Sequence, residues 1–333
     1  MATIKDVAKH AGVAPSTVSY ALSGKRPISI AVKQRIERAI KELGFVPNAQ
    51  AHNLRLGLSR TIAMVHPPYE NMLEGTSIDF ITAAAEALEE THTLSLFPYS
   101  KTADKLLDAF RQRRIDGLIL MHIARHDERI EILKTSDYPF VLIGRTEHTE
   151  DLSLVDFDFE NAAYLAIKHL IDLGHTRIGY LDLSVQEQAE DLGYAFYMKQ
   201  GLERAQSDFK IDLIRQVAGR RNSESYQATQ KLIRNEKNIT AIVALLGATY
   251  LGILRALHDS KKRIPQDCSL ICLGSAAAAR WTIPSITTLD NQLAELGKVA
   301  AELLLERLAG STEIKQILLP AQLVIRESTA ARS

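Results

Sequence analysis

Three side chains in one short stretch carry hydroxyl groups at a spacing that suits contacts with nucleic acid. Ser16, Thr17 and Tyr20 would project from one side of a helix. Val18 and Leu22 would form its opposite, apolar side. In the major groove of DNA, such hydroxyls reach base edges and phosphates, and a tyrosine can also touch a thymine methyl group. The stretch therefore predicts a DNA-reading helix.

Two further amphipathic segments would hold this helix in place. Apolar residues recur at helical spacing on both sides of it, namely Ile4, Val7, Ala8 and Ala11 before it and Val32, Ile36, Ala39, Ile40 and Leu43 after it. Gly12 permits a sharp turn between the first two helices, whereas Ser29 caps the third and Gly44 ends it. The pattern predicts a helix-turn-helix with one small core.

Charge distinguishes this module from the rest of the chain. Residues 1–60 contain ten Lys and Arg residues against three acidic ones, which gives a net charge of about +7. The whole chain has 40 basic and 40 acidic residues, so the remainder carries about −7. Basic side chains bind DNA by releasing the counterions condensed on its phosphates. The charges therefore indicate a DNA-binding module on an acidic body.

The amino-terminal residues resemble those of the LacI/GalR family of bacterial transcription repressors. The stretch TIKDVAKHAGVAPSTVS, residues 3–19, is similar to the family pattern T-I-x-D-V-A-x-x-A-G-V-S-x-x-T-V-S, and residues 47–54 are similar to P-N-x-x-A-R-x-L. The resemblance implies a hinge helix that folds on the operator and pushes Leu54 into the minor groove as a wedge. The DNA contacts that it implies are Thr3, Pro15, Ser16, Thr17, Ser19, Tyr20, Ser29, Asn48, Ala51, His52 and Leu54.

Three positions depart from the family pattern. Ala14 replaces the usual serine at the start of the second helix, where Pro15 preorganises the first turn instead. Tyr20 and His52 stand where the family commonly has arginine. Because tyrosine cannot make the two-hydrogen-bond contact of arginine with guanine, we expect the operator half-site to differ from the usual one.

After residue 60, short apolar strands alternate with longer helices. The clearest strands are Thr61–Val65, Leu94–Phe97, Gly117–Met121, Phe140–Ile143, Ile178–Leu181, Ala241–Leu246 and Leu270–Leu273. This alternation predicts parallel sheets covered by helices. Residues 169–179, HLIDLGHTRIG, resemble a signature of the same family, which implies a periplasmic-binding-protein-like α/β domain with two lobes.

These patterns and the family resemblance together imply the domain boundaries, and the division into lobes is what the resemblance implies. Residues 1–45 form an all-α helix-turn-helix headpiece, 46–60 a hinge helix and linker, and 61–333 a two-lobed effector-binding and dimerisation domain. The first lobe would comprise about 61–156 and a returning segment near 285–319. The second would comprise about 157–284 and a final strand near 321–326. A ligand would bind between the lobes, at the carboxyl ends of the strands.

The residues expected to hold that ligand differ from those of sugar-binding relatives, which carry R-x-x-G, Asn-Asp and Asp-Asp motifs. Here Glu190 precedes Gly193, and Leu246-Gly247 and Gly274-Ser275 replace the two pairs. This predicts a ligand with few hydroxyl groups, whose cationic group meets Glu190 or whose anionic group meets Arg145, or else a lost effector. The candidate lining residues are Tyr69, Tyr99, Arg145, Asp158, Phe159, Glu190, Leu246, Gly274 and Trp281.

Other features limit the alternatives. No signal-like start or long apolar run is present, so we expect a cytoplasmic protein without membrane contact. Cys268 and Cys272 should pack in a core, and neither metal nor cofactor is expected. An α/β enzyme is disfavoured because no G-x-G-x-x-G or P-loop occurs. His169, Asp172 and His175 could act as acid–base groups, but their place at a helix end and turn favours a structural role.

The sequence thus predicts a homodimeric, sequence-specific DNA-binding regulator. Its partners would be a double-stranded DNA operator with pseudo-palindromic half-sites and a small-molecule effector. A ligand-responsive repressor is the leading hypothesis, and an activator or dual regulator with the same headpiece is the alternative.

Overall fold

The computed structural model describes residues 2–23, 26–45, 58–66, 76–219, 221–245, 249–274 and 276–332. The chain divides into two compact units, Met1–Ser59 and Arg60–Ser333, each with its own buried core. Six residues predicted to contact DNA or effector lie outside the described residues, namely Asn48, Ala51, His52, Leu54, Tyr69 and Leu246.

The amino-terminal unit contains the three predicted helices, α1 (Ile4–Ala11), α2 (Pro15–Ser23) and α3 (Ile30–Leu43). Their shared core consists of Val7, Ala8, Ala11, Val18, Ile36 and Ala39. One core prediction is wrong, because Leu22 is 40% exposed and Ala21 packs against the core instead. Both positions lie one turn beyond Val18, so the tilt of α2 against its neighbours decides between them.

Local signals fix the ends of these helices. Thr3 accepts a hydrogen bond from the Asp6 backbone N–H, and the Asp6 carboxylate accepts one from the Thr3 N–H at 2.8 Å, so that α1 starts with a capping box. Gly12 has φ +62° and follows α1 directly, in the left-handed conformation that ends a helix and that side chains disfavour. Ser29 caps α3 by accepting from the Val32 N–H.

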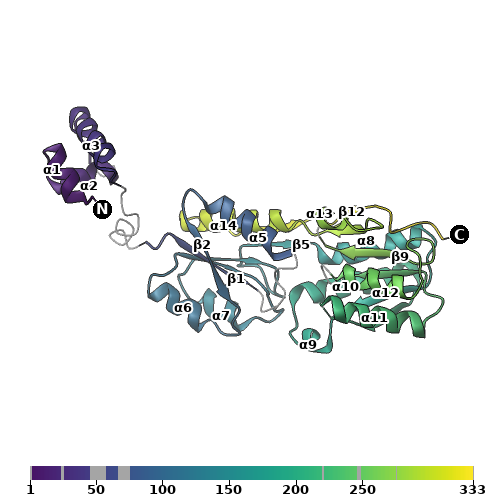
Figure 1. Ribbon diagram of the computed structural model, residues 1–333. Helices are drawn as coiled ribbons and strands as arrows, with labels where there is room; N and C mark the ends of the chain where they lie inside the picture. The colour runs from purple at the N-terminus through teal and green to yellow at the C-terminus, as the bar shows by residue number, and fades with distance from the viewer. Residues whose placement is uncertain are drawn as a thin grey trace. The chain divides into compact units, whose positions relative to one another are not determined.

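The second unit contains two lobes, each built on a six-stranded sheet (Figure 1). The strands of the first sheet, in order, are β11 (Gln316–Leu319), β5 (Leu154–Phe157), β4 (Phe140–Ile143), β3 (Gly117–Leu120), β1 (Thr61–His66) and β2 (Thr93–Pro98). All neighbours in it are parallel. Helices α5 (Thr76–Leu88) and α14 (Leu293–Leu308) cover one face, and α6 (Asp104–Arg111) and α7 (Glu128–Lys134) cover the other.

The second sheet repeats this plan. Its strands, in order, are β12 (Gln322–Val324), β10 (Thr287–Asp290), β9 (Ser269–Leu273), β8 (Ala241–Ala244), β6 (Ile178–Asp182) and β7 (Leu213–Val217). Only the β10–β12 pair is antiparallel. Its covering helices are α8 (Phe159–Asp172) and α10 (Gly193–Phe209) on one face and α11 (Asn222–Asn235) and α12 (Tyr250–Asp259) on the other. Two short helices, α9 (Val185–Gln188) and α13 (Ala276–Ala279), complete the lobe.

The predicted lobe boundary near residue 285 is wrong. Strand β10 pairs with β9 and therefore belongs to the second sheet, and the chain returns to the first lobe only with α14, which packs on α5. Local pattern could not show this, because an apolar strand fits the edge of either sheet equally well.

Helices cover both faces of each sheet, so the central strands are buried on both sides. In β1, Ile62 and Met64 face the core under α5 and α14, whereas Ala63 and Val65 face the core under α6 and α7. The first of these cores continues into the second lobe, where it includes Ile178, Met198 and Val243. The lobes are thus joined by packing as well as by the chain.

The two cysteines and two of the histidines have the structural roles that were predicted. Cys268 and Cys272 are free thiols in the second lobe's core, and burial raises the pKa of Cys268 to about 12. His175 is buried, with Nε2 3.0 Å from Ser269 Oγ, and His169 Nε2 lies 3.0 Å from Thr329 Oγ1. Among the described residues, no helix is long and apolar enough to span a membrane.

Candidate functional site

The first candidate surface is the accessible side of α2. The Ala14 carbonyl accepts hydrogen bonds from the N–H groups of Thr17 and Val18, so the helix starts at Pro15 without a capping hydroxyl. Pro15 and Ser16 are exposed and Thr17, Ser19 and Tyr20 are half-buried, whereas Val18 is fully buried. The packing of Val18 thus leaves the hydroxyl-bearing side of α2 available to a partner.

Tyr20 lies next to a positive charge on this surface. The guanidinium carbon of Arg26 is 5.1 Å from the centre of the Tyr20 ring, within the range of a cation–π contact. Arg26 is exposed and follows α2 in the chain. The pair therefore presents a phenol hydroxyl and a guanidinium together, one suited to a base edge and the other to a phosphate.

Thr3 and Ser29 mark the exposed starts of the other two helices. The Thr3 hydroxyl donates to the Asp6 carboxylate at 2.7 Å. Both Thr3 and Ser29 are exposed. Helix starts carry unpaired N–H groups and a partial positive charge, which suits phosphate contacts. Both residues are therefore caps in this unit, and their positions are compatible with the predicted contacts.

The second candidate site lies where the two lobes meet. The segment after β3 runs beside the segment before α10, with an isolated antiparallel bridge between Ala124 and Leu192. The Gly193 N–H donates to the Ile123 carbonyl at 2.9 Å, and the Arg125 N–H donates to the Asp191 carbonyl at 2.7 Å. Backbone hydrogen bonds therefore hold the two lobes together here.

Glu190 and Tyr99, both predicted to line the cleft, meet at a histidine that sequence reasoning missed. His122 Nε2 lies 3.1 Å from Glu190 Oε2, and the Tyr99 ring stands edge-on to the imidazole at 4.9 Å. His122 follows β3 in the first lobe, whereas Glu190 precedes α10 in the second. Glu190 therefore contacts the opposite lobe.

Beneath Tyr99 lies a buried ion pair that was also missed. Arg129 is 1% exposed, and its Nη2 and Nε atoms donate to the Asp127 carboxylate at 2.6 and 2.9 Å. Nη2 also donates to the His122 carbonyl, and the guanidinium lies 4.8 Å from the Tyr99 ring centre. Within the described part of the chain, Arg129 Nη1 is buried without a hydrogen-bond acceptor. The run Asp127-Glu128-Arg129 looks like solvated surface in the sequence, so no local signal revealed this burial.

Arg145 occupies a similar position after β4. Its Nε donates to the buried Asp156 carboxylate at 2.7 Å, and its guanidinium lies 3.7 Å from the ring centre of Tyr197 in the second lobe. Burial raises the pKa of Asp156 to about 6, although the Arg145 charge opposes that shift. Arg145 Nη2 is buried without an acceptor among the residues described. The group can thus donate a hydrogen bond to a bound acceptor.

The other predicted lining residues are not part of these groups. Asp158 caps α8 by accepting from the Asn161 N–H at 3.0 Å, and Phe159 packs between Phe157 and Tyr194. The Gly274 N–H donates to the Leu289 carbonyl.

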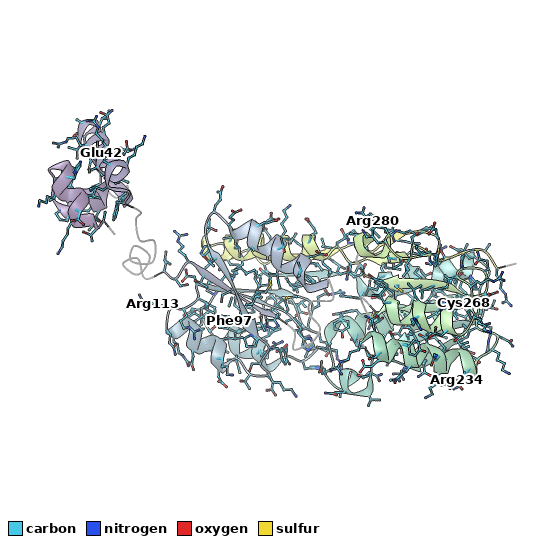
Figure 2. All side chains as sticks on the ribbon, in the orientation of Figure 1. Glu42, Phe97, Arg113, Arg234, Cys268 and Arg280 are labelled. Atoms are coloured by element: carbon cyan, nitrogen blue, oxygen red, sulfur yellow. The ribbon has the colours of Figure 1, made fainter. Side chains whose placement is uncertain are left out.

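Trp281 is exposed at the surface. It is 76% exposed, and its neighbour Arg280, labelled in Figure 2, lies over its ring at 4.8 Å.

In the described part of the chain, no group of three or more His, Cys, Asp or Glu side chains could hold a metal ion.

Each of the two units matches a known protein family model. Residues 3–48 match the model of the lacI family of bacterial regulatory proteins, and residues 167–329 match that of a periplasmic binding protein-like domain. The first match covers the three-helix unit, and the second covers most of the second lobe together with α14.

Individual relatives extend over nearly the whole chain. The HTH-type transcriptional repressor PurR of Mannheimia succiniciproducens is 30% identical over 98% of both chains. The lac repressor dimer bound to operator and the anti-inducer ONPF superposes with a TM-score of 0.85 at 22% identity, over 99% of both chains. The transcriptional regulator CelR in complex with cellobiose gives a TM-score of 0.71 at 25% identity, over 98% of this chain and 100% of that one.

Proposed function

The chain belongs to the LacI family of bacterial regulatory proteins, and we propose that it acts in the cytoplasm as a homodimer on a pseudo-palindromic operator. It is a DNA-binding, ligand-responsive transcriptional repressor and not an enzyme. The observation that carries the DNA-binding role is the accessible side of α2. There Ser16, Thr17 and Tyr20 remain free of the core beside Arg26.

The division of labour on the operator follows from the chemistry of these side chains. Tyr20 reads a base and the surrounding Lys and Arg residues bind phosphates, which position the protein without carrying sequence information. Leu54 enters the minor groove at the operator's centre, where a flexible pyrimidine–purine step lowers the cost of unstacking. Two copies of the headpiece then contact half-sites about one helical turn apart.

Selection of binding sites from random DNA tests this proposal. The enriched sequence should be a pseudo-palindrome, and Leu54→Ala should lose most specific affinity while keeping the salt-dependent binding to random DNA. Equal loss on both kinds of DNA would show that Leu54 is not a wedge. An enriched sequence without twofold symmetry would contradict binding as a homodimer.

The effector proposal rests on Arg145. Its Nη2 is buried and lacks an acceptor among the described residues, so it can donate to an anionic or carbonyl group of a ligand. Glu190 already contacts His122, which favours this alternative over a cation at Glu190. Because the arginine, amide and carboxylate anchors of sugar-binding relatives are replaced, we propose a ligand with few hydroxyl groups.

A thermal-shift screen decides between ligand classes. Free sugars, sugar phosphates, nucleosides and amines are compared on the full chain, since a ligand at a hundred times its Kd stabilises the fold by about 2.7 kcal/mol. An anionic ligand whose shift is lost in Arg145→Gln supports the proposal. A clear shift with a common mono- or disaccharide, with release from the operator, would contradict it.

The effect of operator binding on transcription separates the regulatory modes. Repression requires that the promoter be blocked when the operator is bound, and the alternative of an activator with the same headpiece requires increased transcription. Transcription in vitro from an operator-bearing promoter measures the difference directly.

A further inference from the structure

The first lobe has a cavity at the edge of its sheet opposite the carboxyl ends of the strands. Its volume is about 420 Å³, and it lies where β4 begins and where α7 and α14 end. The strands of this sheet are parallel, so their amino-terminal ends share this edge while their carboxyl ends share the other. The cavity is therefore distinct from the interlobe site around His122 and Arg145.

Two of its charged side chains already neutralise each other. Lys134 Nζ lies 2.8 Å from Asp151 Oδ2, and this hydrogen bond raises the pKa of Lys134. The pair presents no net charge to a ligand. It also holds the end of α7 against the segment that precedes β5, which fixes one wall of the cavity.

The two remaining charged side chains have no ionic partner. Arg307 donates from Nη1 to the Ser311 carbonyl at 3.1 Å, and no carboxylate in the described ranges pairs with its guanidinium. Asp137 likewise has no hydrogen bond or ion pair with any described residue. One unpaired cation and one unpaired anion thus line the same cavity, whose net charge is zero.

An aromatic wall completes the lining. Tyr138, Pro139 and Phe140 are half-buried, and the Tyr138 ring is held in place by stacking on Phe110 at 4.3 Å. Such a wall offers apolar surface to a ligand beside the charged groups. Ser136, Ser311 and Thr312 also line the cavity.

We propose that this cavity binds a zwitterionic small molecule, a free α-amino acid with an apolar or aromatic side chain, as a second ligand of the protein. Its carboxylate pairs with the Arg307 guanidinium, its ammonium group with the Asp137 carboxylate, and its side chain packs against Tyr138 and Phe140. A dianion such as a phosphate ester fits poorly, because Asp137 and Asp151 oppose it and Lys134 is already neutralised. The site is independent of the effector proposed for the cleft.

Calorimetric titration of the full chain carrying Arg145→Gln, which removes the anion-binding side chain proposed for the cleft, tests the charge pattern. Leucine and phenylalanine are compared with isoamylamine and phenethylamine, which lack the carboxylate, and with 4-methylpentanoate and 3-phenylpropanoate, which lack the ammonium group. We expect binding of at least one of the two amino acids, at least about tenfold weakened by removal of either charge. Absence of binding by both amino acids, or equal binding of their singly charged analogues, overturns the proposal.

Substitutions test whether the amino acid binds in this cavity. Arg307→Gln and Asp137→Asn should each weaken amino-acid binding at least about tenfold, whereas Arg234→Gln and Asp208→Asn, on exposed residues of the second lobe, should not. Arg145→Gln should also leave it unchanged, because Arg145 belongs to the interlobe site. Binding that survives Arg307→Gln, or that is lost in Arg145→Gln, contradicts the assignment to this cavity. Unchanged operator binding by Arg307→Gln without amino acid shows that the variant is folded.

Discussion

His122 of the first lobe and Glu190 of the second form a direct contact, with His122 Nε2 3.1 Å from Glu190 Oε2 and the histidine side chain only 3% exposed. Glu190 occupies the position of the arginine in the R-x-x-G motif of the family pattern. Here the same position holds the opposite lobe. Side chains therefore contribute to the contact between the lobes, beside the backbone hydrogen bonds of Gly193 and Arg125.

Glu190→Ala should lower the free energy of unfolding of the second unit, residues 60–333. The substitution removes a charged acceptor from a buried imidazole, and a buried polar group that loses a partner costs about 1–3 kcal/mol. Urea unfolding measures the free energy of unfolding, with Glu150→Ala at an exposed position as the control. Equal stability of the two variants would show that the contact contributes nothing.

Gly193→Ala should separate the lobes at the start of α10. A Cβ atom on Gly193 would lie 2.0 Å from the Arg145 carbonyl oxygen, so the backbone of one lobe must move. We expect a loss of about 1–3 kcal/mol in the free energy of unfolding, although alanine alone would favour the helix.

The matched control for this change is Lys199→Ala, on the exposed side of the same helix. X-ray scattering should show a larger radius of gyration for the isolated body, residues 60–333, in Gly193→Ala than in Lys199→Ala. An unchanged radius and stability would refute the close packing of the lobes.

Because of Asp156, the free energy of unfolding of the second unit should fall as the pH rises from about 4 to about 6. Burial raises its pKa from 3.8 to about 6, so in this window the folded state holds a proton that the unfolded state releases. By linkage, the stabilisation is fully present below pH 3.8 and is lost as the pH passes 6, with a total on the order of 3 kcal/mol.

Asp156→Asn removes this titration and keeps an acceptor for Arg145. Unfolding free energies of wild type and variant, measured from pH 4 to pH 7, should therefore diverge, with the wild type losing stability relative to the variant. Parallel profiles would mean that Asp156 titrates normally in the folded protein.

Tyr20→Ala should relax one position of the operator half-site. The tyrosine lies on the accessible side of α2 beside Arg26, and loss of a base contact costs about 1–3 kcal/mol on the preferred site. Arg26→Gln is the matched comparison, because loss of a phosphate contact should weaken binding to all sequences alike. Identical selected-site profiles for Tyr20→Ala and wild type would show that Tyr20 reads no base.

The sequence by itself determined the features that depend on neighbours in the chain. The boundaries of α1 and α3 follow from Thr3, Gly12, Ser29 and Gly44, because caps act through backbone groups within one turn. The strands β1, β2, β3, β4, β6, β8 and β9 follow from short apolar runs, and the alternation with helices predicts parallel pairing. The headpiece was identified from the likeness of residues 3–19 to a known pattern, because that pattern lies within one continuous stretch of the chain.

Only the tertiary structure decided which distant residues meet. His122 and Glu190 are 68 positions apart, and β10 joined the second sheet instead of the first. Arg129, which reads as a surface charge, is 1% exposed and lies against Tyr99, Asp127 and the His122 carbonyl. Burial and long-range pairing depend on how complete lobes pack, and this packing leaves no periodic signal in the local sequence.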